Sequence, residues 1–402
     1  MGEKFAAHGY FWRPNHTFIY TAMRNNLSSQ ITLTRVPEKY YKPENAYEYS
    51  LLTRFEKVRT HIYATMEEGA GELARELATS IRERQREGKQ FVLAVPGGRS
   101  PYPIFRQLIR MHREEGLSLR NVVVFLIYEF YPLANEAYSN MHLLSEVFLD
   151  HVDIPKGNVY SPDGFIDKND IYDFCRRYEQ RIRECGGIDC MLLGVGQAGT
   201  IGVNSAGTSV SSRTHLVLMD DTSRKESAQL FRSIDNVPAG VITMGLGTLM
   251  EAAKVVLVAW GENKSRIIRE TIEAPASDAV PSTCLQHHPN AKVVIDLSAA
   301  GQLTRISHPW LVTPCVWDNK LIRRAIVWLC AQTDKPILKL TNKDYSEHGL
   351  GELLALYGSA YNVNIRIFND IQHTITGWPG GKPNADDSNR PERAKPYPKR
   401  VI

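Results

Sequence analysis

The sequence contains no long apolar run and no closely paired cysteines. None of its 402 residues belongs to an apolar stretch of 18 or more, so a membrane-spanning helix is not expected. Its six cysteines show no CxxC spacing, which disfavours a zinc motif or a redox motif. The opening residues also lack the apolar core of a signal peptide. These absences predict a soluble, cytoplasmic protein with reduced thiols and no membrane partner.

A strong excess of one charge sign is also missing. Lys and Arg number 48 against 44 Asp and Glu, which gives a net charge of +4. So slight an excess over this length does not indicate a nucleic-acid partner. With 43% hydrophobic residues, the chain is instead long and apolar enough for one large domain and a smaller one.

Short apolar runs alternate with amphipathic segments through the middle of the chain. Residues 67–89 carry Leu73, Leu77 and Ile81 at helical spacing, and "FVLAV" at 91–95 is typical of a buried strand. Further strands are expected at "NVVVFLI", "IDCMLL", "GVIT", "KVVLVAW" and "AKVVIDL". This alternation predicts an α/β fold, with a mainly parallel sheet covered by helices on both faces.

Ligands of such sheets bind beyond the carboxyl ends of the strands. Three loops are expected at this edge, at 96–101, 128–132 and 194–207. The third, "GVGQAGTIGVNSAG", has the glycine spacing of a ligand-binding loop but no carboxylate, histidine or cysteine. The sequence therefore places the site at this edge, beside a loop that lacks titratable groups.

Four regions are expected along the chain. Residues 1–50 are polar and aromatic without a clear period, which predicts an N-terminal arm, and residues 51–302 form the main domain. Residues 303–378 contain two helical segments and a strand at 362–370, which predicts a small C-terminal α/β extension. Residues 379–402 form a tail rich in Pro, Gly and charge that cannot bury much surface.

Five segments in a fixed order resemble one known family. They are "LIRMHREEGLSLRNVVVF", "FLDHVDIPKGNVYSPDG", "SSRT", "ITMGLGTLMEA" and "GENK". Together they resemble the glucosamine-6-phosphate deaminase/isomerase family. The resemblance implies a modified Rossmann-like α/β fold, shared with 6-phosphogluconolactonases and ribose-5-phosphate isomerases. It also implies a sugar-phosphate ligand and a homo-oligomer.

The residues beyond about 305 resemble the connecting segment of a longer variant of that family. In the longer variant this segment leads into a deacetylase-like module with a His-Pro-Asp-Asp metal motif. That motif does not occur in these 402 residues, so neither a metal nor a cofactor is expected.

The phosphate-binding positions of the family are largely matched. Glycines let backbone N–H groups converge on a phosphate, and an Arg fork with a Lys ammonium suits its charge. Arg99 departs from the usual deaminase loop and is closer to the lactonase version. The resemblance assigns phosphate binding to Gly97, Gly98, Arg99, Ser100, Ser211, Ser212, Arg213 and Lys264.

The catalytic positions of the family are not matched. Its Asp-Glu-Tyr stretch, which supplies the base that moves a proton between sugar carbons, falls on "YEF", so Tyr128 stands at the base position. A phenol with a pKa of about 10 is a poor base at neutral pH. The titratable residues of the next loop, including its ring-opening His, are replaced by Ala198, Thr200 and Ser205. Glu129 is the carboxylate left beside the vacant position and is the candidate substitute catalyst.

Other residues offer weaker alternatives. His287 and His288 could replace the lost groups, but a packing role near the last strand is the simpler expectation. Gly194, Gly196 and Gly199 have the spacing of a dinucleotide-binding loop, although they lie deep in the chain. A lactonase is disfavoured because that family also needs a histidine in this loop.

Three functions follow as hypotheses. The first is a protein that binds an amino-sugar phosphate without the usual isomerisation and deamination. The second is a working enzyme with a rearranged site, which converts glucosamine-6-phosphate to fructose-6-phosphate and ammonia through Glu129. The third is a structural or regulatory subunit with a vestigial pocket. A cavity shared by Arg213, Lys264 and the turn at 97–100 would favour the first.

Overall fold

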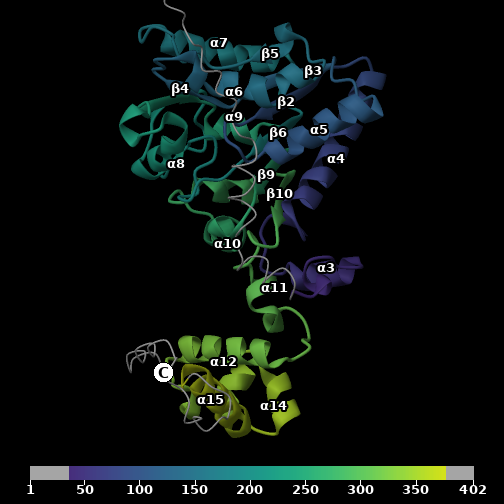
Figure 1. The fold of residues 1–402 in the computed structure, drawn as a ribbon, viewed down its shortest axis with the longest axis vertical. Coiled ribbons are helices and arrows are strands. Elements are labelled where there is room, and N and C mark those ends of the chain that lie inside the picture. Colours follow the sequence, from purple (N-terminus) through teal and green to yellow (C-terminus); the bar gives the residue numbers. More distant parts are fainter. Residues whose placement is uncertain (1–35, 377–402) are drawn as a thin grey trace, which may run out of the picture. The chain divides into compact units, whose positions relative to one another are not determined.

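The computed structural model describes residues 36–376, which form two units (Figure 1). The described part of the first unit comprises residues 36–38 and 57–302, and that of the second comprises residues 39–56 and 303–376. Most of the predicted N-terminal arm and the tail at 379–402 lie outside the described residues.

The first unit is built around a seven-stranded sheet with the order β1-β10-β9-β6-β2-β3-β5. All its strand pairings are parallel. Every residue of β2, β3 and β9 is buried, which explains why their sequences are continuously apolar. The strands are β1 (Arg59–Tyr63), β2 (Phe91–Val95), β3 (Val122–Leu126), β5 (Val159–Tyr160), β6 (Cys190–Leu193), β9 (Val255–Ala259) and β10 (Ala291–Asp296).

A second, three-stranded antiparallel sheet has the order β4-β8-β7. It contains β4 (Tyr128–Tyr131), β7 (His215–Leu218) and β8 (Gly240–Thr243). The prediction of a loop at 128–132 is therefore wrong for most of that segment. The chain leaves β3 and immediately enters β4, where Tyr128 pairs with Thr243 and Glu129 with Ile242.

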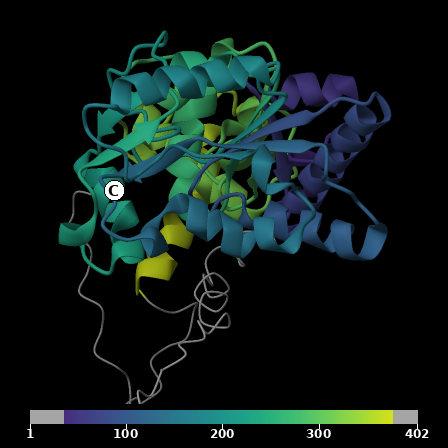
Figure 2. The same cartoon turned by 90° about the horizontal axis from the view of Figure 1, so that it is seen from above.

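Helices cover both faces of the main sheet, as predicted. In Figure 2 the blue helix α5 (Tyr102–Glu115) and the teal helix α7 (Ile171–Glu184) lie on opposite sides of the strands. The helices of this unit are α4 (Met66–Arg86), α5 (Tyr102–Glu115), α6 (Asn140–Val147), α7 (Ile171–Glu184), α8 (Asp221–Phe231), α9 (Leu246–Met250) and α10 (Ser265–Glu273).

Short 3-10 helices connect many of these elements in both units. They are η1 (Glu38–Tyr40), η2 (Glu136–Tyr138), η3 (Leu149–His151), η4 (Lys156–Asn158), η5 (Ile234–Asn236), η6 (Glu262–Lys264), η7 (Pro281–His287), η8 (Pro309–Leu311) and η9 (Ile337–Lys339).

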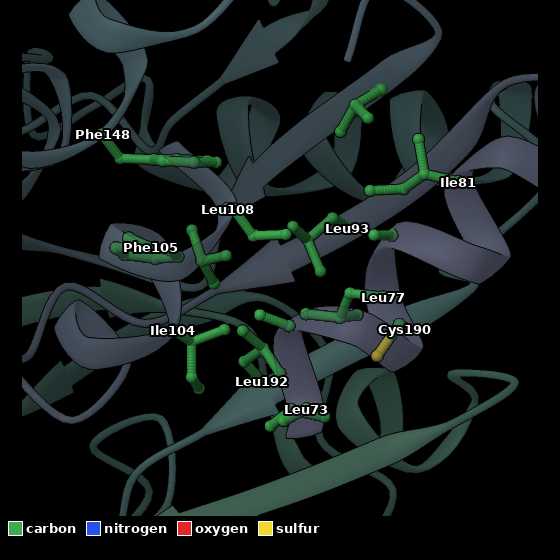
Figure 3. Packing of buried hydrophobic residues seen from close by; sticks show 14 of the residues in the cluster. Leu73, Leu77, Ile81, Leu93, Ile104, Phe105, Leu108, Phe148, Cys190 and Leu192 are labelled. Carbon is green, nitrogen blue, oxygen red and sulfur yellow. The ribbon is translucent and has the colours of Figure 1, made fainter. Parts of the chain in front are cut away.

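Helix α4 shows how the sequence produces the core. The Thr65 side chain accepts a hydrogen bond from the backbone N–H of Glu68 and caps the first turn. Apolar residues then recur every four positions, so that they share one face of the helix. Figure 3 shows this face, with Leu77 and Ile81 near Leu93 of β2 and Leu73 near Leu192 of β6.

The second unit is helical and has a core of its own, centred on Trp310, Ile326 and Tyr345. Its α-helices are α3 (Ala46–Leu52), α11 (Thr304–Ser307), α12 (Asn319–Thr333), α13 (Asn342–Glu347), α14 (Gly351–Tyr357) and α15 (Ala360–Thr376). The predicted α/β character of this extension is wrong, because the strand expected at 362–370 is part of α15.

Residues 39–56 belong to the second unit, which contains a buried ion pair. The side chains of Glu56 and Arg305 are 2% and 1% exposed, and Arg305 Nε lies 2.8 Å from Glu56 Oε1. Such a pair is stable only while both partners are present. Residues 39–56 and the chain after residue 303 are thereby held together. Within residues 36–376, no helix combines the length and apolarity that a membrane span requires.

Candidate functional site

The turn of Gly97–Ser100 joins β2 to α5 at the carboxyl edge of the main sheet. A Cβ atom at Gly97 would overlap the Asn140 side chain, and one at Gly98 would lie 3.5 Å from the Tyr128 hydroxyl oxygen. The absence of a side chain at Gly97 therefore lets the backbone of the turn approach the start of α6, while Gly98 lies in ordinary contact with Tyr128 of β4. The turn also leads into the N-terminus of a 14-residue helix, which favours an anion.

Ser100 links this turn to the loops after β6 and β9. Its carbonyl accepts a hydrogen bond of 2.8 Å from Trp260 Nε1. Its hydroxyl lies so close to Gly194 that a Cβ atom there would be 2.8 Å from Ser100 Oγ. Two of the three loops predicted at this edge, at 96–101 and 194–207, are thus brought together.

Lys264 ends the short 3-10 helix that precedes α10. Its ammonium lies 3.5 Å from Glu226 Oε1, on α8. The same carboxylate oxygen accepts a hydrogen bond of 3.1 Å from the backbone N–H of Gln197. Glu226 therefore joins Lys264 to the loop after β6, and we call Gly97–Ser100 together with Lys264 the anion cradle.

Arg99 extends from the cradle to the same helix. Its guanidinium donates a hydrogen bond of 3.0 Å to Gln229 Oε1. Gln229 follows Glu226 by three residues, which places both side chains on one side of α8. The two cationic groups of the cradle consequently each contact α8.

Tyr128 occupies the base position of the resembled family, at the start of β4. Burial raises the pKa of its hydroxyl, and the nearby charges of Glu129, Tyr102 and Glu226 raise it further. The hydroxyl beside Gly98 therefore stays protonated at neutral pH. In that form it donates a hydrogen bond but cannot act as a general base.

Glu129 is 1% exposed and serves as an acceptor at the start of α6. Its carboxylate accepts hydrogen bonds from the backbone N–H groups of Phe130 and Asn140 at 2.9 Å and of Met141 at 3.0 Å. Burial raises the pKa of Glu129 to about 7, against the opposing effect of these three donors. This geometry gives the candidate substitute catalyst a structural role at the helix N-terminus.

The loop after β6 keeps a tight, glycine-dependent shape. Gly199 has φ +80, and a Cβ atom there would lie 2.6 Å from Val280 Cγ1. The Gly196 N–H donates to the Thr200 carbonyl at 3.0 Å, and the Asn204 amide donates to the Met244 carbonyl at 2.9 Å. In the described chain, residues 194–214 form no helix. A dinucleotide-binding motif would open a helix, so that alternative loses its structural context.

The three substituted positions of this loop differ in their surroundings. Ala198 is exposed, Ser205 is half-buried and Thr200 is 7% exposed. Thr200 lies against Gly196, where a Cβ atom would overlap its hydroxyl. None of the three side chains titrates near neutral pH.

Ser212 and Arg213 are engaged with other elements. Ser212 Oγ accepts a hydrogen bond of 2.9 Å from the Leu246 N–H at the start of α9. Arg213 pairs with Glu251 through Nη1, and with Glu179 of α7 at 2.6 Å through Nη2. The hydrogen bonds and ion pairs of Arg213 therefore go to α7 and the end of α9, whereas Lys264 reaches α8. Ser211 is exposed, and its hydroxyl lies 2.9 Å from that of Ser209.

The carboxylate of Glu179 shows why Arg213 matters there. Burial raises the pKa of Glu179, but hydrogen bonds from Thr214, Thr248 and Arg213 outweigh it and leave the pKa below its ordinary value. The side chain is 6% exposed and ionised, so it needs these donors. Arg213 stabilises a buried anion that belongs to the protein itself.

His288 has a packing role. Its ring nitrogens lie 2.9 Å from the Ala252 carbonyl and 3.0 Å from the Asn290 N–H, so the ring joins two loops. His287 ends the 3-10 helix η7. Among residues 36–376, no group of three or more His, Cys, Asp or Glu side chains is arranged to hold a metal ion.

Sequence reasoning missed several residues that surround the cradle. Asn140, Gly194 and Trp260 contact the 97–100 turn, while Glu226 and Gln229 reach its cations from α8. The helix itself had a signal, because Asp220 in "DDTS" accepts a hydrogen bond from the Ser223 N–H as an N-cap. No sequence pattern indicates that its side chains meet Lys264 and Arg99.

The parallel sheet, with helices on both faces and a glycine turn at its carboxyl edge, defines a Rossmann-like α/β protein. Residues 64–295 match the family described as glucosamine-6-phosphate isomerases/6-phosphogluconolactonase. The chain belongs to this family.

Individual relatives have names that agree with this family. A glucosamine-6-phosphate deaminase-like protein of Bacteroides thetaiotaomicron is 61% identical over 381 residues, 94% of this chain and 58% of that relative. This chain therefore spans less than two thirds of the relative's length. A glucosamine-6-phosphate deaminase of Bacillus velezensis is 36% identical over 57% of this chain and 95% of its own length.

Solved structures give the same fold. A monomeric glucosamine-6-phosphate deaminase superimposes with a TM-score of 0.58 at 34% identity, covering 60% of this chain and 99% of its own. A 6-phosphogluconolactonase of Trypanosoma brucei superimposes with a TM-score of 0.51 at 20% identity, covering 62% of this chain and 99% of its own. The second likeness concerns the fold alone.

Proposed function

We propose that this protein binds an amino-sugar 6-phosphate at the anion cradle and does not carry out isomerisation and deamination. One observation carries the proposal. The glycine turn lies beside the protonated hydroxyl of Tyr128, which stands at the base position, while Arg99 of that turn and Lys264 both contact α8. The curated names of the relatives, which include glucosamine-6-phosphate deaminases, support this class of ligand.

The substitutions explain why turnover is not expected. A general acid or base contributes about 10²–10⁴ in rate when its pKa lies near the working pH. Tyr128 has its pKa raised above the ordinary phenol value, and Ala198 and Thr200 offer no titratable group. Without a base and without a ring-opening His, the bound sugar would keep its proton and its amine.

Titration calorimetry with glucosamine 6-phosphate and with glucosamine tests the binding proposal. We expect the phosphate ester to bind and the unphosphorylated sugar to bind far more weakly. At a hundredfold excess over its Kd, the ester should stabilise the fold by about 2.7 kcal/mol in thermal unfolding. If the ester produced no heat of binding and no change in stability, the proposed binding would be refuted. Ammonia release at a deaminase-like rate would refute the proposed lack of deamination.

The alternative of a working deaminase draws on one specific feature. Burial brings the pKa of Glu129 to about 7, the range of a general acid or base, although its oxygens face the N-terminus of α6. If Glu129 were the base, ammonia release would be measurable and would vanish in Glu129→Gln while the Kd for glucosamine 6-phosphate stayed the same.

We further propose a homo-oligomer in the cytoplasm, as the family resemblance implies. Sedimentation velocity on the 402-residue chain tests the first part. A single species at 45.4 kDa would contradict it. A vestigial pocket would instead leave assembly intact and ligand binding absent.

A further inference from the structure

We propose that Glu226 is a built-in competitor for the anion cradle, whose carboxylate occupies Lys264 until a phosphate-bearing ligand displaces it. The inference rests on the proposed function and adds a regulatory contact to the same site. We call the contact between Glu226 and Lys264 the α8 latch.

The latch brings a carboxylate against the loop after β6. Glu226 Oε1 lies 3.5 Å from Lys264 Nζ and accepts a hydrogen bond of 3.1 Å from the Gln197 N–H. The other oxygen would lie 3.3 Å from a Cβ atom at Gly196. A lysine and a loop N–H are the donors that a phosphate oxygen would use. The carboxylate therefore occupies donors suited to a ligand.

A second contact from the same helix strengthens the latch. Gln229, one turn after Glu226, accepts a hydrogen bond of 3.0 Å from Arg99. The side chains of Lys264 and Glu226 are 19% and 33% exposed, so the ion pair is accessible to a competing anion. One turn of α8 thus engages both cations of the cradle at once.

Competition of this kind has a defined thermodynamic effect. Molecules with the latch closed cannot bind an anion. The apparent Kd therefore equals the Kd of the open form divided by the fraction of molecules that are open. An ion pair of this exposure holds the closed state by a factor of about two to five. The effect is equal for every anion and absent for a neutral ligand that leaves Lys264 untouched.

The test compares Glu226→Gln with the unmodified chain by titration calorimetry, with glucosamine 6-phosphate and inorganic phosphate as probes. We expect the Kd of both probes to fall about three- to sixfold, because the open fraction rises from about one third to one sixth up to one. Asp221→Asn is the matched control, because it removes one carboxylate charge from the exposed first turn of the same helix. Its Kd values should equal those of the unmodified chain.

The outcomes separate the latch from the proposed function. Equal Kd values in Glu226→Gln and the unmodified chain would overturn the latch alone. Weaker binding by Glu226→Gln would also overturn it, because Glu226 would then assist the ligand. An equal fall of the Kd in Asp221→Asn would also overturn the latch, because the loss of any one negative charge on α8 would then explain the effect. No binding of glucosamine 6-phosphate by any of these proteins would overturn the proposed function, and the latch with it.

Discussion

The side chains of two adjacent residues, Tyr128 and Glu129, contact different elements. Successive side chains on a strand point to opposite faces, so Tyr128 lies beside Gly98 while Glu129 is buried under α6. The family resemblance identified both positions from sequence. It could not show that the remaining carboxylate accepts three backbone N–H groups, because those donors come partly from residues 140 and 141.

The raised pKa of Glu129 predicts a pH dependence of stability. Its pKa of about 7 in the folded protein exceeds the ordinary value of 4.5, so the folded state binds more protons between these values. The free energy of unfolding should therefore fall as the pH rises from about 4.5 to about 7, by up to about 3 kcal/mol from this group. Urea unfolding at several pH values should show a smaller decline in Glu129→Gln. Parallel curves for the two proteins would contradict the prediction.

Lys264 and Arg213 should separate binding from stability. Lys264→Ala removes an ammonium from the cradle, and we expect the Kd for glucosamine 6-phosphate to rise at least tenfold with little change in unfolding. Arg213→Ala removes a partner from the buried Glu179 and should cost about 1–3 kcal/mol of stability, with a nearly unchanged Kd. Titration calorimetry gives the Kd of each variant, and urea unfolding gives its free energy of unfolding. A raised Kd in Arg213→Ala, with lost stability in Lys264→Ala instead, would show that Arg213 and not Lys264 binds the phosphate.

At the scale of elements, the continuously apolar strands were predictable and the short or half-buried ones were not. β2, β3 and β9 lie where their sequences indicate, because strands covered on both faces contain little else than apolar residues. No strand was expected at β1, β5 or β7. β7, for example, alternates partly buried and exposed positions over four residues, which is too short a pattern to recognise.

The strand predicted at 362–370 fails for a physical reason. Its sequence alternates apolar and polar residues, but Val363 and Ile367, four positions apart, are the fully buried pair. Asn364 is buried as well, and its amide donates a hydrogen bond of 2.8 Å to the Leu340 carbonyl. Tertiary packing of α15 therefore overrides the local alternation.

The two glycines of the 97–100 turn should differ in how well they tolerate alanine. Gly97→Ala places a Cβ atom on the Asn140 side chain and should cost about 1–3 kcal/mol of stability as well as ligand affinity. Gly98→Ala meets Tyr128 at an ordinary contact distance of 3.5 Å and should unfold almost like the unmodified chain. Thermal unfolding of both variants provides the comparison. Equal losses would mean that the turn moves freely away from α6.

At the scale of the whole molecule, the match to the family covers residues 64–295 of the first unit, and the second unit lies outside it. The Bacillus velezensis deaminase aligns over 231 residues, whereas the Bacteroides thetaiotaomicron relative aligns over 381, more than residues 1–302 could supply. The helical extension is therefore shared with that longer relative. The sequence indicated two of its helices, α12 and α14, but not that residues 39–56 belong to the same unit.

The buried ion pair of the second unit predicts a large effect of a small change. Glu56→Gln leaves the Arg305 guanidinium, 1% exposed, without its carboxylate and should cost about 3–5 kcal/mol. Three tryptophans, Trp310, Trp317 and Trp328, lie in or against this core, so their fluorescence during urea unfolding reports its transition. Glu44→Gln, at an exposed position of the same unit, is the control. An unchanged midpoint in Glu56→Gln would show that the pair is dispensable.

The same ion pair spans 249 positions of the chain. During synthesis, residues 39–56 leave the ribosome long before Arg305 exists, and the whole sheet unit is translated in between. Domains generally fold in the order in which they emerge. Residues 39–56 are therefore made long before Arg305, and a nascent chain that stops before residue 305 cannot form this ion pair.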